Sequence, residues 1–490
     1  MDGKPTYSKR RPETTVLYRV VQEHFATFVA MHDQSERPLP PYVLSEFASF
    51  IKCGILAHGF CRVYCAHCGY DRLVAFSCKK RGFCSPCISR RMSGTAAHLV
   101  DRVLPLVPMR QWVLTVPHPI RYLMSYDPEL CSRVVTEHVR SVFIWLRRKA
   151  KAELGLRSTT DAQAGAVTAL QRFNSAAALS VHIHSVVTDG VFVRTPDGQS
   201  VTFRALSAPT NADIAAVAWS TCRRVVAYLR KQGRWTDATD AGDDSGDAFA
   251  QEQPGLAQCY TGSVLGILVL GPRAGTRVIR LRGQAASTDP FRPRFANGFD
   301  VHAGVRVFAH DRKGLERLCR YLLRPPFSRE RLTRRPDGNV QLRLKRAFRC
   351  GTTHMVFEPL DFLSKLAALV PPPRAHLVRY SGVFAPNAKL RPLVVPQPQD
   401  DVQPCCHDGE GEKDSASLFS RRASWAQLMA RVFEIDVLEC PKCKSRMQRI
   451  SIITEPSVIR AILNSVGMPA DSPRSYPAKL PEQAELDFAS

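Results

Sequence analysis

The sequence predicts an α+β protein of several domains, and three observations lead to this prediction. The chain has 490 residues, which is enough for two to four domains at roughly 100 to 200 residues each. Its middle part alternates short β-rich runs with helical patterns, which favours an antiparallel or mixed sheet with flanking helices. Cysteine pairs with two intervening residues occur in the N-terminal part and again near residue 440.

Composition narrows the function classes. A hydrophobic content of 44% supports real cores, and 68 Lys and Arg against 44 Asp and Glu give a net charge of +24. This charge favours a polyanionic partner, with nucleic acid as the leading candidate. No uncharged apolar run approaches the roughly 20 residues that cross a bilayer, and the first residues lack the apolar stretch of a signal peptide. We therefore expect a soluble cytoplasmic protein with no membrane partner, whose cysteines are metal ligands or redox groups rather than bridges.

The expected elements divide the chain into four parts. Residues 1–105 form a helical, cysteine-rich module. Residues 106–395 form the α+β core, with helices expected at 132–154, 213–232 and 314–324. Its strands are expected at residues 111–116, 166–170, 179–187, 265–270 and 301–308.

Two polar stretches interrupt this pattern. Residues 237–254 hold six acidic residues and no basic ones, and they predict a disordered insertion. Residues 396–424, rich in Pro, Gln, Asp, Glu and Gly, predict a linker. The small C-terminal region, 425–490, contains an amphipathic run at 425–433, one cysteine pair and a Pro-containing tail.

The cysteine-rich segment contains Cys65-Ala-His-Cys68 and Cys84-Ser-Pro-Cys87, with fifteen residues between the two pairs. Two such knuckles can place four thiolates at the corners of a tetrahedron, as in a closed structural zinc site. We expect Cys65, Cys68, Cys84 and Cys87 to be the ligands, with Cys78 as a substitute. Buried free cysteines are the alternative.

Basic residues follow Cys78 directly. Lys79, Lys80 and Arg81 would give the module a face for phosphate contacts, although an ordinary solvated charge run has the same composition. A lone pair, Cys440-Pro-Lys-Cys443, lies near the C-terminus. A second zinc there would have to recruit Cys405, Cys406 or His407 across the linker, and the sequence leaves this open.

A His-x-His pattern lies in the expected strand at residues 179–187. With a period of two, His182 and His184 point to one face, and Val181, Ile183 and Val187 point to the other. Two imidazoles on one face can chelate a divalent metal. Histidines on strands are also often structural polar residues, so the pattern alone does not decide.

A tyrosine occupies a special position on the helix that ends before Pro325-Pro326. At about 100° per residue, Leu315, Leu318, Cys319 and Leu322 share an apolar face, and Tyr321 lies at its edge beside Arg317 and Arg324. Guanidinium groups there would stabilise a phenolate and orient a phosphodiester. Residues 312–349 hold 13 Lys and Arg against 3 Asp and Glu. An amphipathic tyrosine with a packed ring and a wet hydroxyl is the alternative.

Together these motifs resemble a known family. The order of a cysteine-pair module, the run Gln171-Arg-Phe-Asn-Ser, then Val-His-Ile-His and Asp-Gly-Val-Phe192, and finally Leu315-Glu-Arg-Leu-Cys-Arg-Tyr-Leu-Leu-Arg-Pro-Pro326 is similar to that of the rolling-circle transposases of bacterial insertion sequence ninety-one and of the insertion-sequence common-region elements. These belong to the HUH endonucleases, named for His-hydrophobic-His. The resemblance continues through Gly351-Thr-Thr-His354 to the cysteine pair near residue 440.

The resemblance implies a zinc-binding DNA-recognition module followed by an HUH endonuclease core. It makes His182 and His184 ligands of Mg²⁺ or Mn²⁺ and makes Tyr321 the nucleophile. Some members carry two tyrosines four residues apart, whereas Arg317 and Pro325 stand at those positions here, so the chain resembles the single-tyrosine branch. The third metal ligand varies in the superfamily; the candidates in this chain are Glu316, Asp189 and His354.

The implied activity is cleavage and rejoining of single-stranded DNA at element ends and target through a 5′-phosphotyrosine. Arg317, Arg320 and Arg324 would contact the DNA backbone. The resemblance also implies a bacterial protein associated with the nucleoid, and it leaves homo-oligomerisation open. Two alternatives stand beside it: a rolling-circle replication initiator or relaxase, and a non-catalytic zinc-finger protein that only binds DNA.

Overall fold

The centre of the molecule is a five-stranded antiparallel sheet. The computed structural model describes residues 10–235, 247–271, 273–282, 298–348, 350–397, 425–433 and 435–480. In the central sheet the strand order is β10-β3-β6-β5-β14, and β6 is the middle strand. The bounds are β3 (Met109–Thr115), β5 (Gly165–Phe173), β6 (Leu179–Thr188), β10 (Asp300–Val307) and β14 (Val378–Gly382).

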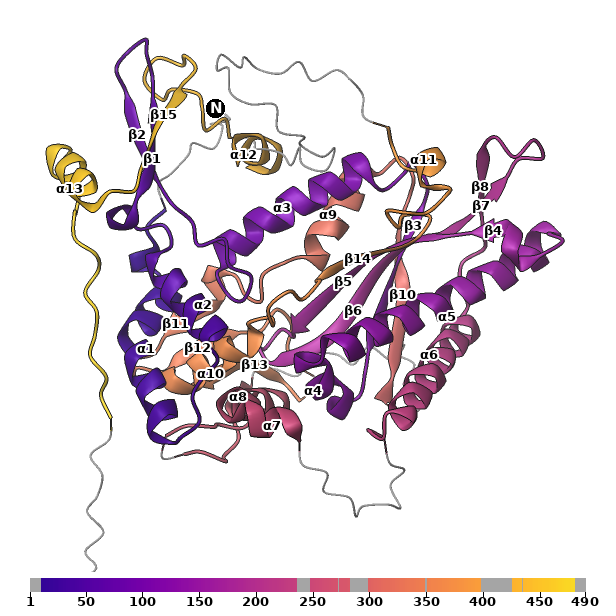
Figure 1. Cartoon of the computed structure of the whole chain (residues 1–490), viewed down its shortest axis with the longest axis horizontal. Coiled ribbons are helices and arrows are strands. Elements are labelled where there is room, and N and C mark those ends of the chain that lie inside the picture. The colour runs from indigo at the N-terminus through magenta and orange to yellow at the C-terminus, as the bar shows by residue number, and fades with distance from the viewer. Residues whose placement is uncertain are drawn as a thin grey trace, which may run out of the picture.

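Helices cover both faces of this sheet (Figure 1). Successive side chains along each strand point to opposite faces, so each face packs against a different set of helices. Side chains such as Trp112 and Ile183 pack into the same core as α5 (Pro128–Leu154) and α6 (Asn211–Lys231). Side chains of the opposite face, such as Met109 and Val186, pack with α3 (Ser85–Arg102) and α9 (Arg312–Leu322). The even-numbered residues of β6 therefore lie on the side of α9.

Capping residues fix the ends of these helices. Asp127 caps α5, whose first residue is Pro128, and Gly155 ends it in the left-handed conformation with φ of 64°. Thr210 and Asp213 form a capping box at the start of α6. Asp311 accepts a hydrogen bond from Gly314 N at 2.7 Å at the start of α9. These signals explain why the three helices begin where they do.

Two smaller sheets and further helices surround the centre. The strands are β11 (Leu332–Arg334), β12 (Val340–Arg343), β13 (Thr352–Phe357) and β9 (Ile279–Arg282) in one sheet, and β4 (Ala162–Gln163), β7 (Gly190–Arg194) and β8 (Val201–Ala205) in the other. The helices are α1 (Val16–Gln34), α2 (Pro41–Lys52), α4 (His118–Tyr126), α7 (Ala248–Glu252), α8 (Pro254–Leu265), α10 (Pro359–Leu369) and α11 (Arg391–Val394).

The C-terminal part of the chain joins the N-terminal module. Strand β1 (Phe60–Tyr64) pairs with β2 (Asp71–Ala75) on one side and with β15 (Gln448–Ile453) on the other. Figure 1 shows these three strands together, away from the central sheet, with α13 (Pro456–Ser465) beside them. Helix α12 (Trp425–Phe433) lies against α3.

The predicted α+β class with an antiparallel sheet is confirmed, and four of the five predicted strands form. The strand expected at residues 265–270 is wrong: Leu265 ends α8, Gly266 follows in the left-handed conformation, and only Ile267 forms an isolated bridge. Part of the insertion expected at 237–254 is helical, because α7 and the start of α8 fall within it. The rest, residues 237–246, and nearly all of the expected linker lie outside the described residues.

Candidate functional site

The two histidines of β6 lie side by side on the face covered by α9. Their ring centroids are 4.9 Å apart. The antiparallel register places Gln171 of β5 opposite His182 and Val113 of β3 opposite His184. Residues opposite one another share a face, so the pair is flanked by side chains from both neighbouring strands.

Both imidazoles are held neutral. Burial lowers the pKa of His182 to about 4, and burial together with the charge of His182 lowers the pKa of His184 to about 3. Nδ1 of His182 lies 2.7 Å from the carbonyl oxygen of Ser180 and must therefore carry a proton. Its Nε2 then has a free lone pair in the neutral ring.

His184 has a polar neighbour that the sequence did not reveal. The side-chain nitrogen of Gln111, on β3, lies 2.8 Å from His184 Nδ1. Nε2 of His184 is buried and has no hydrogen-bond partner within the described part of the chain. With the Gln111 amide turned over, its oxygen accepts from Nδ1–H and leaves the Nε2 lone pair free. A neutral imidazole with a free nitrogen is what a divalent metal requires, so the two histidines fit such an ion.

Tyr321 faces the histidine pair from α9. Its ring is perpendicular to that of His184, with centroids 5.8 Å apart. The side chain is 45% exposed, whereas Leu315, Leu318, Cys319 and Leu322 are buried. The predicted place at the edge of the apolar face is confirmed. The phenol is thus next to the histidines and open to solvent.

Cationic side chains surround the phenol. The Arg324 guanidinium lies 5.1 Å from the Tyr321 ring centroid and 5.1 Å from that of Phe173, and Lys345 Nζ lies 5.8 Å from Tyr321. Burial lowers the pKa of Arg324, while the neighbouring phenol acts in the opposite direction. Arg317 is exposed, and Arg320 forms an ion pair with Glu316 at 3.6 Å. Of the three predicted DNA-binding arginines, Arg324 is the one that stacks on the tyrosine.

A second residue missed by the sequence reasoning fixes the end of α9. Gln171 Nε2 donates to the carbonyl oxygens of Tyr321, at 3.0 Å, and Leu322, at 2.7 Å. The last carbonyls of a helix lack partners within the helix, so this side chain supplies them. A glutamine in a strand gives no sequence signal for such a role, because the role depends on which helix packs above it.

The three candidates for a third metal ligand are engaged elsewhere. Asp189 accepts from Arg110 at 2.7 and 3.1 Å and from Arg306 at 2.7 Å. Glu316 accepts from Arg431 at 2.7 Å. His354 lies on β13, in a different sheet. Among the described residues, no third Cys, Asp, Glu or His groups with His182 and His184 at ligand distance.

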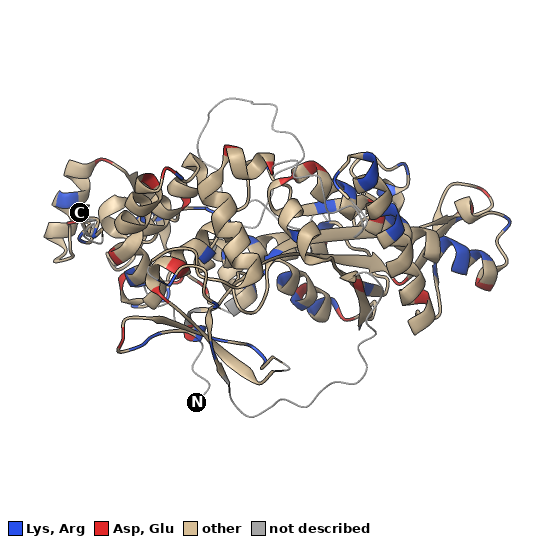
Figure 2. Ribbon diagram, turned by 90° about the horizontal axis from the view of Figure 1, so that it is seen from below, with Lys and Arg blue, Asp and Glu red and all other residues tan. Residues whose placement is uncertain are grey.

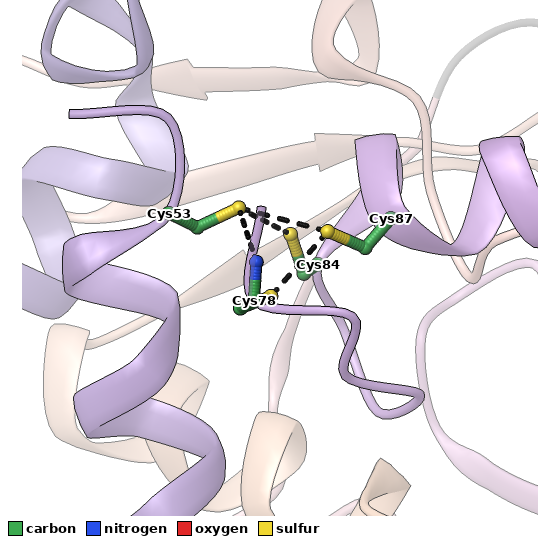
Figure 3. Close-up of side chains that lie close together, drawn as sticks. All are labelled: Cys53, Cys78, Cys84 and Cys87. Atoms are coloured by element: carbon green, nitrogen blue, oxygen red, sulfur yellow. Dashed lines mark hydrogen bonds between the residues drawn. The ribbon is translucent and has the colours of Figure 1, made fainter. Parts of the chain in front are cut away.

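Eight of the cysteines in the described ranges form two clusters of four, and the first lies inside the N-terminal module. Cys53, at the end of α2, and Cys78, after β2, meet Cys84 and Cys87 at the start of α3 (Figure 3). The Cys53 sulfur is 3.7 Å from that of Cys84 and 3.6 Å from that of Cys87, and Cys78 is 3.4 Å from Cys87. A tetrahedron of Zn–S bonds near 2.3 Å has edges of about 3.8 Å. The spacing therefore suits one zinc ion.

The predicted set of Cys65, Cys68, Cys84 and Cys87 is wrong, because the structure does not bring these two pairs together. Cys65 and Cys68 group instead with Cys440 and Cys443. The reason is the hairpin: Cys65 and Cys68 lie at the turn between β1 and β2, whereas Cys84 follows its open end. Each strand of the hairpin has five residues, so its turn and its open end are about 15 Å apart. The partners considered earlier, Cys405, Cys406 and His407, lie outside the described residues.

The basic residues beside the first cluster are partly used within the fold. Lys80 donates to Ser45 Oγ at 2.9 Å, and Arg81 donates to the carbonyl oxygen of Ala375 at 2.8 Å. Lys79 is exposed. Figure 2 shows Lys and Arg spread along most of the described ribbon rather than gathered at one end.

None of the helices in the described ranges is long and apolar enough to span a membrane.

Comparison with known families matches both the cysteine-containing module and the region that holds the histidines and Tyr321. Residues 20–116 match the transposase zinc-binding domain, and residues 165–391 match a domain described as a putative transposase. No curated protein and no solved structure matches the chain. The first range contains Cys53, Cys78, Cys84 and Cys87, and the second contains both histidines and Tyr321.

A zinc-binding module joined to this domain defines a transposase, with DNA as its partner and structural zinc as its metal. The two matches together support a transposase like that of insertion sequence ninety-one.

Proposed function

We propose that this transposase cuts and rejoins single-stranded DNA during rolling-circle transposition, by way of a covalent bond between Tyr321 and a DNA 5′-phosphate. One observation carries the proposal. The exposed phenol of Tyr321 on α9 has its ring centroid 5.8 Å from that of His184 on β6, whose Nε2 has no hydrogen-bond partner among the described residues. This closeness of two elements distant in sequence supports the roles proposed for Tyr321 as nucleophile and for the histidines as metal ligands.

The proposed reaction is an in-line displacement at phosphorus. The oxygen of Tyr321 forms a bond to the scissile phosphate as the bond from phosphorus to the 3′-oxygen breaks. The phenol loses its proton and the departing 3′-oxygen gains one. In the reverse step a 3′-hydroxyl attacks the phosphotyrosine and releases Tyr321. The phosphodiester energy is retained in the covalent bond, so rejoining needs no ATP.

His182 and His184 would hold a Mg²⁺ or Mn²⁺ ion, which neutralises charge on the scissile phosphate when bound. The carbonyl of Ser180 and the amide of Gln111 orient the two rings. Burial keeps the rings neutral at physiological pH. The low pKa values therefore favour ligand roles over proton transfer.

Positive charge near Tyr321 would hold the substrate. Arg324 and Lys345 flank the ring, where they can stabilise a phenolate and contact the phosphate. Exposed Arg317, with Arg320, would contact the DNA backbone on either side. Lys79, Lys80 and Arg81 would serve the zinc module, residues 1–105, in recognition of the element end. Residues 106–395 would carry the cleavage chemistry.

The test is detection of the covalent adduct. The full chain is incubated with a labelled single strand that carries the element end, with Mg²⁺ or Mn²⁺. We expect a denaturant-stable adduct whose tryptic peptide contains Tyr321, and no adduct with Tyr321→Phe, which removes one oxygen and keeps the ring. Tyr228→Phe, on α6, is the matched control and should retain the full yield.

The outcome also separates the alternatives. An adduct of equal yield in Tyr321→Phe would place the nucleophile elsewhere. Cutting by both proteins without an adduct would mean direct hydrolysis by water. Binding without any cutting would favour the DNA-binding role alone.

A further inference from the structure

The second cysteine cluster joins the N-terminal module to the C-terminal region. Cys65 and Cys68 follow β1, and Cys440 and Cys443 precede β15. The sulfur of Cys65 is 3.5 Å from that of Cys443, and the sulfur of Cys68 is 3.5 Å from that of Cys440. All four sulfurs lie within 4.8 Å of one another. Cys440 and Cys443 fall outside both ranges that match the family models.

The two loops that carry these cysteines have the same backbone conformation. In the first, Cys65 N donates to Tyr70 O and Gly69 N donates to Cys65 O, each at 2.9 Å. In the second, Cys440 N donates to Ser445 O and Lys444 N donates to Cys440 O, also at 2.9 Å. Each loop has a positive φ at its fifth residue, 70° for Gly69 and 63° for Lys444.

This shared turn has a chemical meaning. A lysine in the left-handed region is about 1 kcal/mol less stable than in a right-handed one, so the second loop adopts the turn despite its residue. The turn points both thiols of a C-x-x-C pair to one side, as zinc knuckles do. Two knuckles that face each other supply four ligands.

Distances exclude disulfides as the reason for the cluster. Sulfur atoms in a disulfide are about 2.05 Å apart, whereas the closest pairs here are at 3.5 Å. A tetrahedral zinc–thiolate site has sulfur–sulfur edges of about 3.8 Å. We infer that Cys65, Cys68, Cys440 and Cys443 bind a second structural zinc ion, whose ligands come half from each end of the chain.

The surroundings bring the two halves together. Strand β15 pairs with β1 along its whole length, from Phe60 opposite Ile453 to Tyr64 opposite Gln448. Val63 and Met447 are buried beside Cys65 and Cys440 in one apolar cluster. Arg72, on β2, donates to the carbonyl oxygen of Val437 at 2.7 Å. The knuckles are thus held in place by a sheet, a core and a side-chain bond.

The zinc would also help to fix α12, which contacts the helix that carries Tyr321. Arg431, on α12, donates to Asp101 of α3 at 3.0 Å and to Glu316 of α9 at 2.7 Å. Glu316 lies on the same helix as Tyr321. The second zinc would therefore hold Cys440 and Cys443, a few residues after α12, whose Arg431 links α9 to α3.

Metal content of the full chain tests the inference without any measurement of DNA cleavage, so its failure is distinct from failure of the proposed function. We expect two zinc ions per chain for the wild type. We expect one for Cys440→Ser/Cys443→Ser, one for Cys65→Ser/Cys68→Ser, and one for the quadruple variant, because all remove the same site. Cys350→Ser, at an exposed cysteine outside both clusters, is the control and should keep two. Two zinc ions in Cys440→Ser/Cys443→Ser, or none in the quadruple variant, would overturn the inference.

Alkylation of the wild type covers the case in which a variant does not fold. Cys68 and Cys350 are both exposed. With zinc bound, Cys68 should react with iodoacetamide at least about tenfold more slowly than Cys350, because a coordinated thiolate is occupied. A chelator should release Cys68 and Cys443 together. Equal reaction rates of Cys68 and Cys350 in the zinc-loaded chain would contradict the inference.

Discussion

The side-chain amide of Gln171 donates to the carbonyl oxygen of Tyr321 at 3.0 Å. Gln171 lies directly opposite His182 in the sheet, so one residue touches the strand of the histidine pair and the helix of the tyrosine. This side chain therefore helps to fix the distance between the proposed nucleophile and the proposed metal ligands, together with the packing of α9 against α3.

Gln171→Leu should separate positioning from binding. The variant keeps most of the side-chain volume but leaves the Tyr321 and Leu322 carbonyls without this donor, so the end of α9 loses its alignment. We expect nicking of a single strand to slow by roughly ten- to a hundredfold, with DNA affinity nearly unchanged. Gln251→Leu, at an exposed position on α7, is the control. Unchanged nicking in Gln171→Leu would show that the bond does not position the tyrosine.

Replacement of both His182 and His184 by Ala should abolish metal-dependent nicking. Loss of the proposed ion's ligands is expected to cost at least about a hundredfold in rate. DNA binding should persist, since it depends on distributed phosphate contacts. His354→Ala, in a separate sheet, should nick as well as the wild type. Nicking that persists in the double variant, or that EDTA does not affect, would contradict ligand roles for these imidazoles.

Cys84→Ser should release the zinc ion of the first cluster. A closed site with one weak ligand loses affinity steeply, and Cys84 lies in the main apolar core beside Phe83. We expect one zinc ion fewer per chain and a lower midpoint of thermal unfolding than for Cys350→Ser. The measurement is metal analysis with calorimetry on the full chain. An unchanged zinc content would reject the assignment of Cys84.

His138 should make the stability of the protein depend on pH. Burial lowers its pKa to about 4 from 6.5, and neither ring nitrogen has a partner in the described residues. The unfolded chain therefore binds the proton first, so this contribution is fully present above pH 6.5 and is lost as the pH falls toward 4. Between pH 7 and pH 5 it amounts to about 2 kcal/mol.

The variant His138→Leu supplies the comparison. It removes the titrating ring and keeps an apolar side chain in the core, so its free energy of unfolding should fall by about 2 kcal/mol less than that of the wild type over this pH range. Denaturant titrations at the two pH values measure the difference. Parallel losses in both proteins would show that His138 does not titrate in this way.

Local sequence patterns were sufficient to predict how several side chains of the candidate site are oriented. Alternation along residues 179–187 predicted that His182 and His184 share a face, and helix geometry predicted that Tyr321 lies at the edge of the leucine face. Neither pattern contains the strand register or the packing of α9, so the contacts of Gln111 and Gln171 could not be foreseen. The relation between His184 and Tyr321 depends on the same long-range packing.

The cysteines show the limit most clearly. The spacing from Cys65 to Cys87 is compatible with a single four-thiol site, and nothing local excludes it. What decides the pairing is that β15 returns to β1 and brings Cys440 with it. The strand expected at 265–270 failed for a different reason: Gly266 and Gly271 both take positive φ values, so an apolar run turns instead of extending.

The arrival of β15 at β1 has a consequence for synthesis on the ribosome. Cys68 and Cys440 are 372 residues apart, which corresponds to roughly 20 to 70 s of translation at about 5 to 20 residues per second. During that interval β1 has one open hydrogen-bonding edge, and Cys65 and Cys68 have only each other as ligands. An open edge with free thiols is prone to pair with other chains. The N-terminal hairpin of a nascent chain is therefore exposed to mispairing and oxidation until the last strand has emerged.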